Sequence, residues 1–441
     1  MKLLYKVPKG DLRDDRPLCI NIFQKHPAAL ATCEIPPSSE YRRHMKFDCR
    51  TGHFQVRRHT AAASLMIIAL TAKIVFAQTP TLKTRTKEDR EREFQASHRI
   101  TLNIQVTDAA GKPVTDLDAR DFTILDNHQS RKLAAFHAID GQAMNDATEI
   151  VIVLDTVNST KQALEAERNG IFKFLAQTHG PLPYTTSFVL LANGHLKATG
   201  PTTDRNALGR AFVNITKNLR SEACAPVDAS LAQAVAGGGV GAVGSSNIGN
   251  RAVGVATCLE QHFKDSISAL DGIAQKQLAL GGRTILVWVG PGWPLLSDVE
   301  FQQLSPKARK GFFAETVSVL HDLRAAQVTV DQVGPRDATR ESEIARVNLH
   351  QLTSGTALPE NAGPGSLALQ VLAEQTGGRV MATSNDVAAD LGKIIGDADW
   401  YYAMSFGAPP AQNGVELHSL EVKVSRSDLH VRTMTAYYTE P

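Results

Sequence analysis

Residues 149–155 form the stretch of this chain that most constrains its fold. They read EIVIVLD, an uninterrupted apolar, mostly β-branched run that ends in Asp155. A run of this kind is typical of a strand buried on both faces, as at the centre of a parallel sheet. Hydroxyl-bearing residues follow, and a helical pattern begins at about residue 161. Because open α/β sheets bind ligands beyond the carboxyl ends of their strands, Asp155 is predicted to lie at the functional edge of the sheet.

Strand and helix patterns alternate over residues 148–398. Further strands are predicted at 184–191, 283–289 and 328–333, with helical patterns between them. This alternation predicts an α/β domain, Rossmann-like, with a doubly wound and mostly parallel sheet.

The two flanking regions, 98–147 and 399–441, show the period-two alternation of strands instead. Such strands do not easily extend a parallel sheet without crossovers. We therefore predict that they pair with each other in a β-sandwich built from both ends of the domain.

The N-terminal region has the pattern of a secretory signal peptide. Arg57 and Arg58 precede the short apolar stretch 60–77, which ends in the small-x-small sequence Val75-Phe76-Ala77. A short membrane anchor is the alternative. Signal peptides begin near the start of a protein, and Met45 would begin a conventional one. The prediction is thus a signal peptide at 45–77, an incorrect start or disordered extension at 1–44, and a linker at 78–97.

Charge and cysteine usage follow the same division. Residues 1–77 hold 13 basic and 6 acidic residues, whereas residues 78–441 hold 34 and 39, a formal net charge of −5. A mildly acidic body argues against nucleic acid as a partner, and membrane contact is expected only through the signal segment. Cys224 and Cys258 alone follow the predicted cleavage site. In an oxidising compartment they are predicted to form a disulfide at the base of the Gly-rich segment 221–256, with two free buried thiols as the alternative.

The order and spacing of the motifs resemble the von Willebrand factor A-type domain, specifically the VWFA-related family common in secreted acidobacterial proteins. The resemblance covers about residues 98–440. It implies an A-type α/β domain at 148–398 and an extracytoplasmic interaction module rather than an enzyme. The segments that carry it are GKPVTDLDARDFTILDNHQSRKLAAF (111–136), EIVIVLDTVNST (149–160), RTILVWVGPGW (283–293), LAEQTGGRVM (372–381) and VKVSRSDLHVRTMTAYY (422–438).

A-type domains often bind a divalent cation through Asp-x-Ser-x-Ser after the first strand, a Thr in a later loop and an Asp after the fourth strand. The resemblance maps Asp155 and Ser159 onto the first motif, and Thr203 or its neighbour Thr202 onto the loop Thr.

The chain departs from this pattern at two positions. Val157 offers no oxygen, and Gly290 stands where the second Asp is expected. Hard cations take six or more oxygen ligands. The expectation is therefore a degenerate site without a required cofactor, at which Asp155 caps the following helix or accepts loop amides. Mg²⁺ or Ca²⁺ held by Asp155, Ser159 and Thr203 is the alternative.

Together these features predict an exported, non-enzymatic module that binds a protein or cell-surface polymer through the loops after residues 155, 200 and 290. Asp155, Ser159 and Thr203 are candidate contacts. This interpretation as an adhesive module requires that the Asp155 carboxylate does not point into the interior. Trp293 is either an apolar interface contact or a lid folded back over the sheet. The expected location is extracytoplasmic: periplasmic, outer-surface or secreted. The alternatives are a structural envelope component without a ligand at this edge and a periplasmic hydrolase, for which no nucleophile–base spacing is present.

Overall fold

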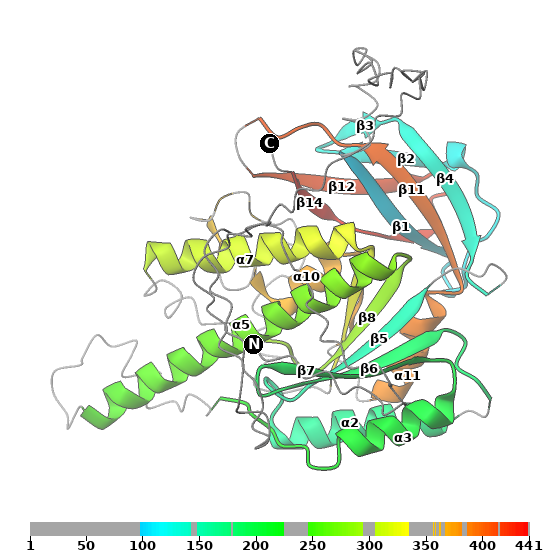
Figure 1. Cartoon of the computed structure of the whole chain (residues 1–441). Helices are drawn as coiled ribbons and strands as arrows, with labels where there is room; N and C mark the ends of the chain where they lie inside the picture. Colours follow the sequence, from blue (N-terminus) through cyan, green and yellow to red (C-terminus); the bar gives the residue numbers. More distant parts are fainter. Residues whose placement is uncertain are drawn as a thin grey trace, which may run out of the picture. The chain divides into compact units, whose positions relative to one another are not determined.

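The structure, a computed structural model, consists of an α/β layer and a β-sandwich (Figure 1). It describes residues 98–142, 148–177, 180–224, 246–293, 305–334, 356, 358, 361–362, 367–381, 386–412 and 415–439. The chain divides into two compact units, Met1–Thr81 and Leu82–Pro441, and all described residues belong to the second. The predictions for 1–44, 45–77 and 78–97 lie outside the described residues. Among the helices that are described, none combines the length and apolarity that a bilayer crossing requires.

The α/β layer is built on one six-stranded sheet in which β5 is central, as predicted for residues 149–155. β5 pairs in parallel with β6 and β8, and every residue of β5 is buried. Only β7 is antiparallel; it returns from β6 through Asn193 and Gly194, both with positive φ, which is the usual chemistry of a two-residue hairpin. In spatial order the strands are Val380–Met381 (β10), Val328–Val333 (β9), Thr284–Val289 (β8), Glu149–Asp155 (β5), Thr185–Ala192 (β6) and His195–Thr202 (β7).

Helices cover both faces of this sheet, so the predicted doubly wound arrangement is confirmed (Figure 1). Alternate side chains of the strands enter two separate apolar cores, one on each face. One face is covered by α2 (Lys161–Ala176), α3 (Arg205–Ile215) and α11 (Val387–Gly396), the other by α5 (Ser246–Leu280), α7 (Pro306–Ala325) and α10 (Leu369–Gln375).

Helix α5 begins earlier than the sequence pattern predicts. The apolar periodicity favours a start near Cys258, because Gly249 and Gly254 each disfavour helix by about 1 kcal/mol relative to Ala. The structure carries the helix through both glycines from Ser246. The predicted Gly-rich loop is therefore partly helical, and residues 225–245 lie outside the described part.

The β-sandwich takes strands from both ends of the described chain, as predicted. In one sheet β1 pairs with β11 and in the other β2 pairs with β12, and side chains of both sheets share one apolar core. The 3-10 turn Ala119–Asp121 precedes β2. The first sheet comprises His430–Arg432 (β13), Arg99–Thr107 (β1), Trp400–Gly407 (β11) and Leu133–Asp140 (β4); the second comprises Ala436–Thr439 (β14), Glu416–Val424 (β12), Phe122–Asp126 (β2) and Gln129–Arg131 (β3).

A network of charged side chains joins the sandwich to the α/β layer. Asp397, just after α11, accepts two hydrogen bonds of 2.8 Å from the Arg379 guanidinium. Its carboxylate also pairs with Arg432 of β13, and Arg432 in turn donates to Gln105 of β1. Arg283, just before β8, donates to the Asp397 backbone carbonyl (3.4 Å). One carboxylate thus connects strands of the two layers.

Asp331 of β9 lies beside this network, and burial raises its pKa to about 7, with Asp397 adding to the shift and Arg432 opposing it. The pKa of an Asp side chain in an unfolded chain is about 3.9. The folded state therefore holds the proton more tightly. This contribution to stability is complete below about pH 4 and is lost as the pH rises through about 7.

Asp331→Asn should remove this dependence, because an amide cannot ionise and its oxygen can still accept the backbone hydrogen of Arg379 (2.7 Å in the wild type). Measured by urea unfolding, the stability of Asp331→Asn relative to wild type is expected to rise by a few kcal/mol between about pH 5 and 8. Parallel pH profiles of the two proteins would contradict the assignment.

Candidate functional site

The Asp155 loop, residues 155–159, follows β5 at the carboxyl edge of the sheet. The chain proceeds from β5 to β6 on one side and returns to β8 on the other, so the loop stands where the strand order reverses. This placement agrees with the prediction from the sequence.

The Asp155 carboxylate points into the protein, with 0% of the residue exposed. Its Oδ2 accepts hydrogen bonds from Trp288 Nε1 (3.0 Å) and Asn158 Nδ2 (2.9 Å), and its Oδ1 accepts one from the Asn158 backbone (3.0 Å). These donors satisfy much of the carboxylate's bonding capacity. Asp155 therefore organises its own loop and does not present an oxygen to a partner. The predicted adhesive module, with Asp155 as a contact, is wrong, because it required this carboxylate to point outward.

Ser159 is also turned inward. Its Oγ donates to Glu167 Oε2 of α2 (2.8 Å), and both residues are fully buried. The helix cap is supplied by the next residue, Thr160, whose hydroxyl accepts the backbone hydrogen of Ala163. Ser159 thus fixes α2 to the loop.

Gly290 fills the position at which an A-type domain carries its second Asp. Its φ of 146° is rarely adopted by residues with side chains, and a Cβ placed there would lie 2.7 Å from the Asp155 Cβ. A carboxylate at this position would require β8 and the Asp155 loop to separate.

Thr203 lies at the opposite edge of the sheet. Asp155 is level with Leu191 on β6, whereas Thr202, at the end of β7, pairs with Thr186 at the start of β6. The hairpin reverses the chain direction, so Thr203 lies at the end of the sheet opposite to Asp155 and Ser159. Thr203 therefore cannot join them in one site.

Trp293 adopts the lid arrangement rather than that of an interface contact. It is 3% exposed, and its Nε1 donates to the Leu367 carbonyl (2.8 Å). Its ring meets Phe263 and Trp288 edge-on, at centroid distances of 5.9 and 6.3 Å. Trp293 closes the apolar core above β8.

These residues do not fit a divalent cation. Asp155 accepts hydrogen bonds, Ser159 donates to a carboxylate, and Thr203 is at the other edge. Asn158 Oδ1 is a buried oxygen without a hydrogen-bond donor among the described residues. One amide oxygen is far from the six or more ligands that Mg²⁺ or Ca²⁺ requires.

Residues 221–224 cross over the Asp155 loop and cover it. Ser221 Oγ donates to the Ser159 carbonyl (2.6 Å), and the Glu222 backbone donates to the Thr156 carbonyl (2.9 Å). Cys224 ends this strap in a disulfide to Cys258 of α5, as the sequence predicts.

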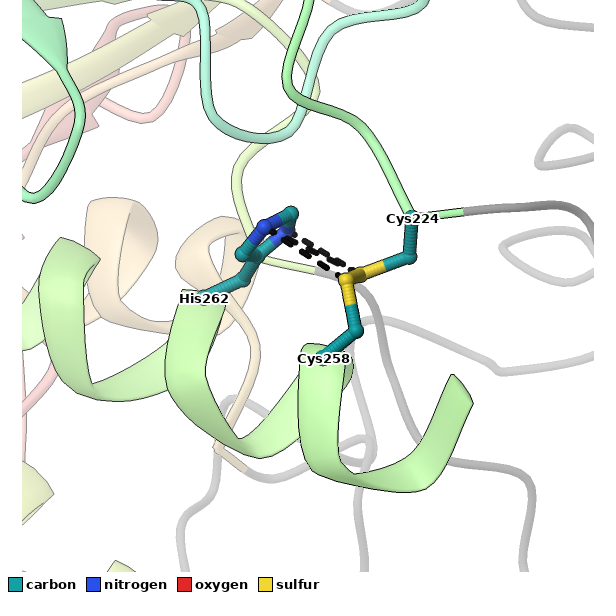
Figure 2. A group of neighbouring side chains, drawn as sticks. All are labelled: Cys224, Cys258 and His262. Atoms are coloured by element: carbon teal, nitrogen blue, oxygen red, sulfur yellow. Dashed lines mark hydrogen bonds between the residues drawn. A yellow bond between two sulfur atoms is a disulfide. The ribbon is translucent and has the colours of Figure 1, made fainter. Parts of the chain in front are cut away.

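The disulfide lies against the ring of His262, one turn after Cys258 on α5 (Figure 2). His262 Nδ1 is 3.2 Å from Cys224 Sγ. Burial lowers the pKa of His262, and the negative charges of Asp155, Asp265 and Glu222 oppose that shift. The ring is therefore mainly neutral at neutral pH.

One accessible feature of the described residues at this edge is an open groove of about 530 Å³ between the first half of α2 and the segment after α3. We call it the basic groove. Four cationic side chains line it, against one carboxylate, Glu165, among the lining residues described. A second cavity, of about 40 Å³ beneath α7, has room for only a few water molecules. The basic groove is lined by Lys161, Leu164, Glu165, Arg168, Thr216, Lys217, Leu219, Arg220 and Ser221.

The cations of the basic groove are available to a ligand. Lys161, Lys217 and Arg220 are exposed, and Arg168 is half-buried with its Nε 3.4 Å from Thr216 Oγ1. No carboxylate in the described ranges forms an ion pair with any of the four.

The groove was not predicted from the sequence, although one of its two walls has a recognisable sequence pattern. Lys161, Leu164, Glu165 and Arg168 have the spacing i, i+3, i+4, i+7 that places residues on one face of a helix. The other half follows α3, about fifty positions later, and its proximity depends on how α2 and α3 pack.

Comparisons with known proteins give remote structural matches. No protein-family model and no curated protein sequence matches the chain. Among solved structures, the human COPII-coat protein Sec24c is 10% identical with a TM-score of 0.30, covering 75% of this chain and 48% of Sec24c. The manganese-loaded TRAP protein of Plasmodium vivax is 8% identical with a TM-score of 0.29, and the match covers 68% of this chain and 96% of the TRAP chain. The chain therefore spans about half of the Sec24c chain.

Proposed function

We propose that this chain is an exported, non-enzymatic binding module that recognises a carboxylate-bearing ligand, carried by a protein or a cell-surface polymer, in the basic groove. The observation that carries the proposal is the groove itself, where four cations face one carboxylate at the ligand-binding edge of an α/β sheet. Export remains supported by the signal-peptide pattern at 45–77.

The form of the groove suits an extended anionic ligand. Lys161 and Arg168 lie seven residues apart, about 10 Å along the α2 axis. Lys217 and Arg220 face them from the other wall. Guanidinium groups bind carboxylates in a planar, two-point manner, whereas lysines act as point charges. A ligand with several spaced carboxylates would contact both walls together.

The Asp155 loop has a supporting role in this proposal. Ser159 bonds to Glu167 on the buried side of α2, and Ser221 at the end of the groove bonds to the Ser159 carbonyl. The loop thus fixes the two groove walls relative to each other. Recognition through the groove requires no metal ion.

A binding role rather than catalysis is favoured by the chemistry of the groove walls. The described lining includes neither histidine nor cysteine, and its one carboxylate belongs to exposed Glu165. Ser221 Oγ is already donating to a backbone carbonyl. A nucleophile paired with a base, which a hydrolase needs, is not present among these residues.

Substituting Lys161, Lys217 and Arg220 together by Gln should weaken binding of an acidic probe by about 3- to 150-fold, since each exposed charge pair contributes about 0.2–1 kcal/mol and 1.4 kcal/mol is tenfold. Two probes, a poly-glutamate peptide and polygalacturonate, distinguish a protein from a polysaccharide ligand. Fluorescence anisotropy at several salt concentrations gives the affinity and its salt dependence, which should be shallower in the variant.

The matched control replaces Arg210, Lys276 and Lys307, which are exposed but outside the groove, by Gln. It makes the same change in net charge and should bind as wild type. If both triple variants lost the same affinity for the probe, the effect would be due to overall net charge and not to the groove. Failure of the wild type to bind either probe would refute the groove as a site for acidic ligands.

A further inference from the structure

Cys224, Cys258 and His262 place two sulfurs and an imidazole within reach of one point (Figure 2). Their ligand atoms all lie within 4.8 Å of one another, which makes them a potential metal-binding group among the residues that the structure describes. His262 is 8% exposed, and the two sulfurs are the partners of its ring nitrogens in the described part of the chain. The disulfide occupies the sulfurs in this state.

The same three atoms have nearly the spacing of a zinc site. With Zn–S near 2.3 Å and Zn–N near 2.0–2.1 Å, a tetrahedral site sets its sulfur and nitrogen ligands about 3.6 Å apart. His262 Nε2 lies 3.8 Å from Cys224 Sγ and 3.6 Å from Cys258 Sγ. Once the disulfide is broken, only the two sulfurs need to move apart, to about 3.8 Å.

The location of the three residues makes this movement small. Cys258 and His262 are one helical turn apart on α5, so they project from the same face of a rigid element. Cys224 lies on the strap, in neither a helix nor a strand, and is the ligand that can adjust.

We propose that Cys224, Cys258 and His262 form a soft-metal site that the disulfide closes and reduction opens. A dithiol reductant supplies two electrons and two protons: the Cys224–Cys258 bond breaks, both sulfurs become thiols, and the reductant is oxidised to its own disulfide. Zn²⁺ then replaces the two thiol protons, which pass to solvent, and is held by two thiolates and His262 Nε2. Thiolate and imidazole ligands select Zn²⁺ or Cu⁺ over Mg²⁺ or Ca²⁺. This inference is independent of the proposed function of the basic groove.

The test uses the full chain with Cys19, Cys33 and Cys49 replaced by Ser, so that Cys224 and Cys258 are its only thiols. The reduced protein is titrated with Co²⁺, whose absorption reports thiolate ligands and tetrahedral geometry, and then with Zn²⁺ in competition. One metal ion per chain is expected, with a thiolate-to-cobalt charge-transfer band that Zn²⁺ abolishes. The oxidised protein should show no such band.

Variants separate the site from adventitious binding. His262→Ala should weaken Zn²⁺ at least about tenfold, since loss of even an outer-shell partner has that effect. His430→Ala, at an exposed histidine of β13, should leave affinity unchanged. Absence of the band in the reduced protein, or unchanged affinity in His262→Ala, would overturn the proposal. If reduction alone unfolds the chain, Zn²⁺ must restore its circular dichroism; failure to do so also counts against the site.

Discussion

Asp155→Ala is expected to lower the free energy of unfolding by about 3 kcal/mol, because the substitution removes the acceptor of three buried hydrogen bonds and each stranded donor costs about 1–3 kcal/mol. The donors are the indole of Trp288 and the side chain and backbone of Asn158. Loss of the buried charge itself offsets part of the sum. Urea unfolding followed by Trp fluorescence measures the change directly.

Ser159→Ala gives the size of a smaller structural change in the same loop. It breaks one hydrogen bond, to Glu167, and should lower the free energy of unfolding by about 1 kcal/mol. A second comparison, with added ions, tests whether Asp155 is a metal ligand. Millimolar Mg²⁺ or Ca²⁺ should shift the melting temperature of neither wild type nor Asp155→Ala, because a ligand stabilises only a state that binds it. Stabilisation of the wild type alone by either ion would reverse the conclusion that the Asp155 loop does not fit a cation.

Asp397→Ala is expected to destabilise the protein by about 3–5 kcal/mol, the usual effect of removing one partner from a buried ion pair. Its carboxylate is 12% exposed and holds both Arg379 and Arg432, so two guanidinium groups would lose their counter-ion. Because Arg432 belongs to the sandwich and Arg379 to the α/β layer, the two layers should also come apart more easily. Hydrogen exchange should show the largest increase at β1 and β13.

Asp116 provides the matched control for this prediction. It pairs with Arg426 at 3.1 Å, but its side chain is 72% exposed. Asp116→Ala should therefore change stability by less than about 1 kcal/mol. Equal effects of the two substitutions would show that the Asp397 network is not a junction between the layers.

The fold was largely predictable because its strands carry strong, local signals. Residues 149–155 coincide with β5, since a continuous apolar run marks a strand buried on both faces. The predicted strand at 328–333 coincides with β9, although Asp331 and Gln332 interrupt its apolar pattern. The pairing of the two ends in one sandwich followed from their period-two patterns and from the absence of crossover helices near them.

The site was less predictable because its geometry depends on partners distant in the sequence. Trp288 meets Asp155 from the neighbouring strand, and no local pattern near residue 155 reveals an indole donor. Thr203 was misplaced since the strand before it runs antiparallel, which moves the following loop to the other edge. The disulfide was predictable from counting, as Cys224 and Cys258 are the only cysteines after the predicted cleavage site.

The sandwich has a consequence for how the chain reaches its native state. Ile100 of β1 pairs with Phe406 of β11, and Phe122 of β2 pairs with Val424 of β12. During synthesis the leading strands leave the ribosome long before their partners exist. Contacts this far apart in sequence form slowly, and unpaired strand edges promote aggregation. We therefore expect the nascent chain to need a holding chaperone until translation of its last strand is complete.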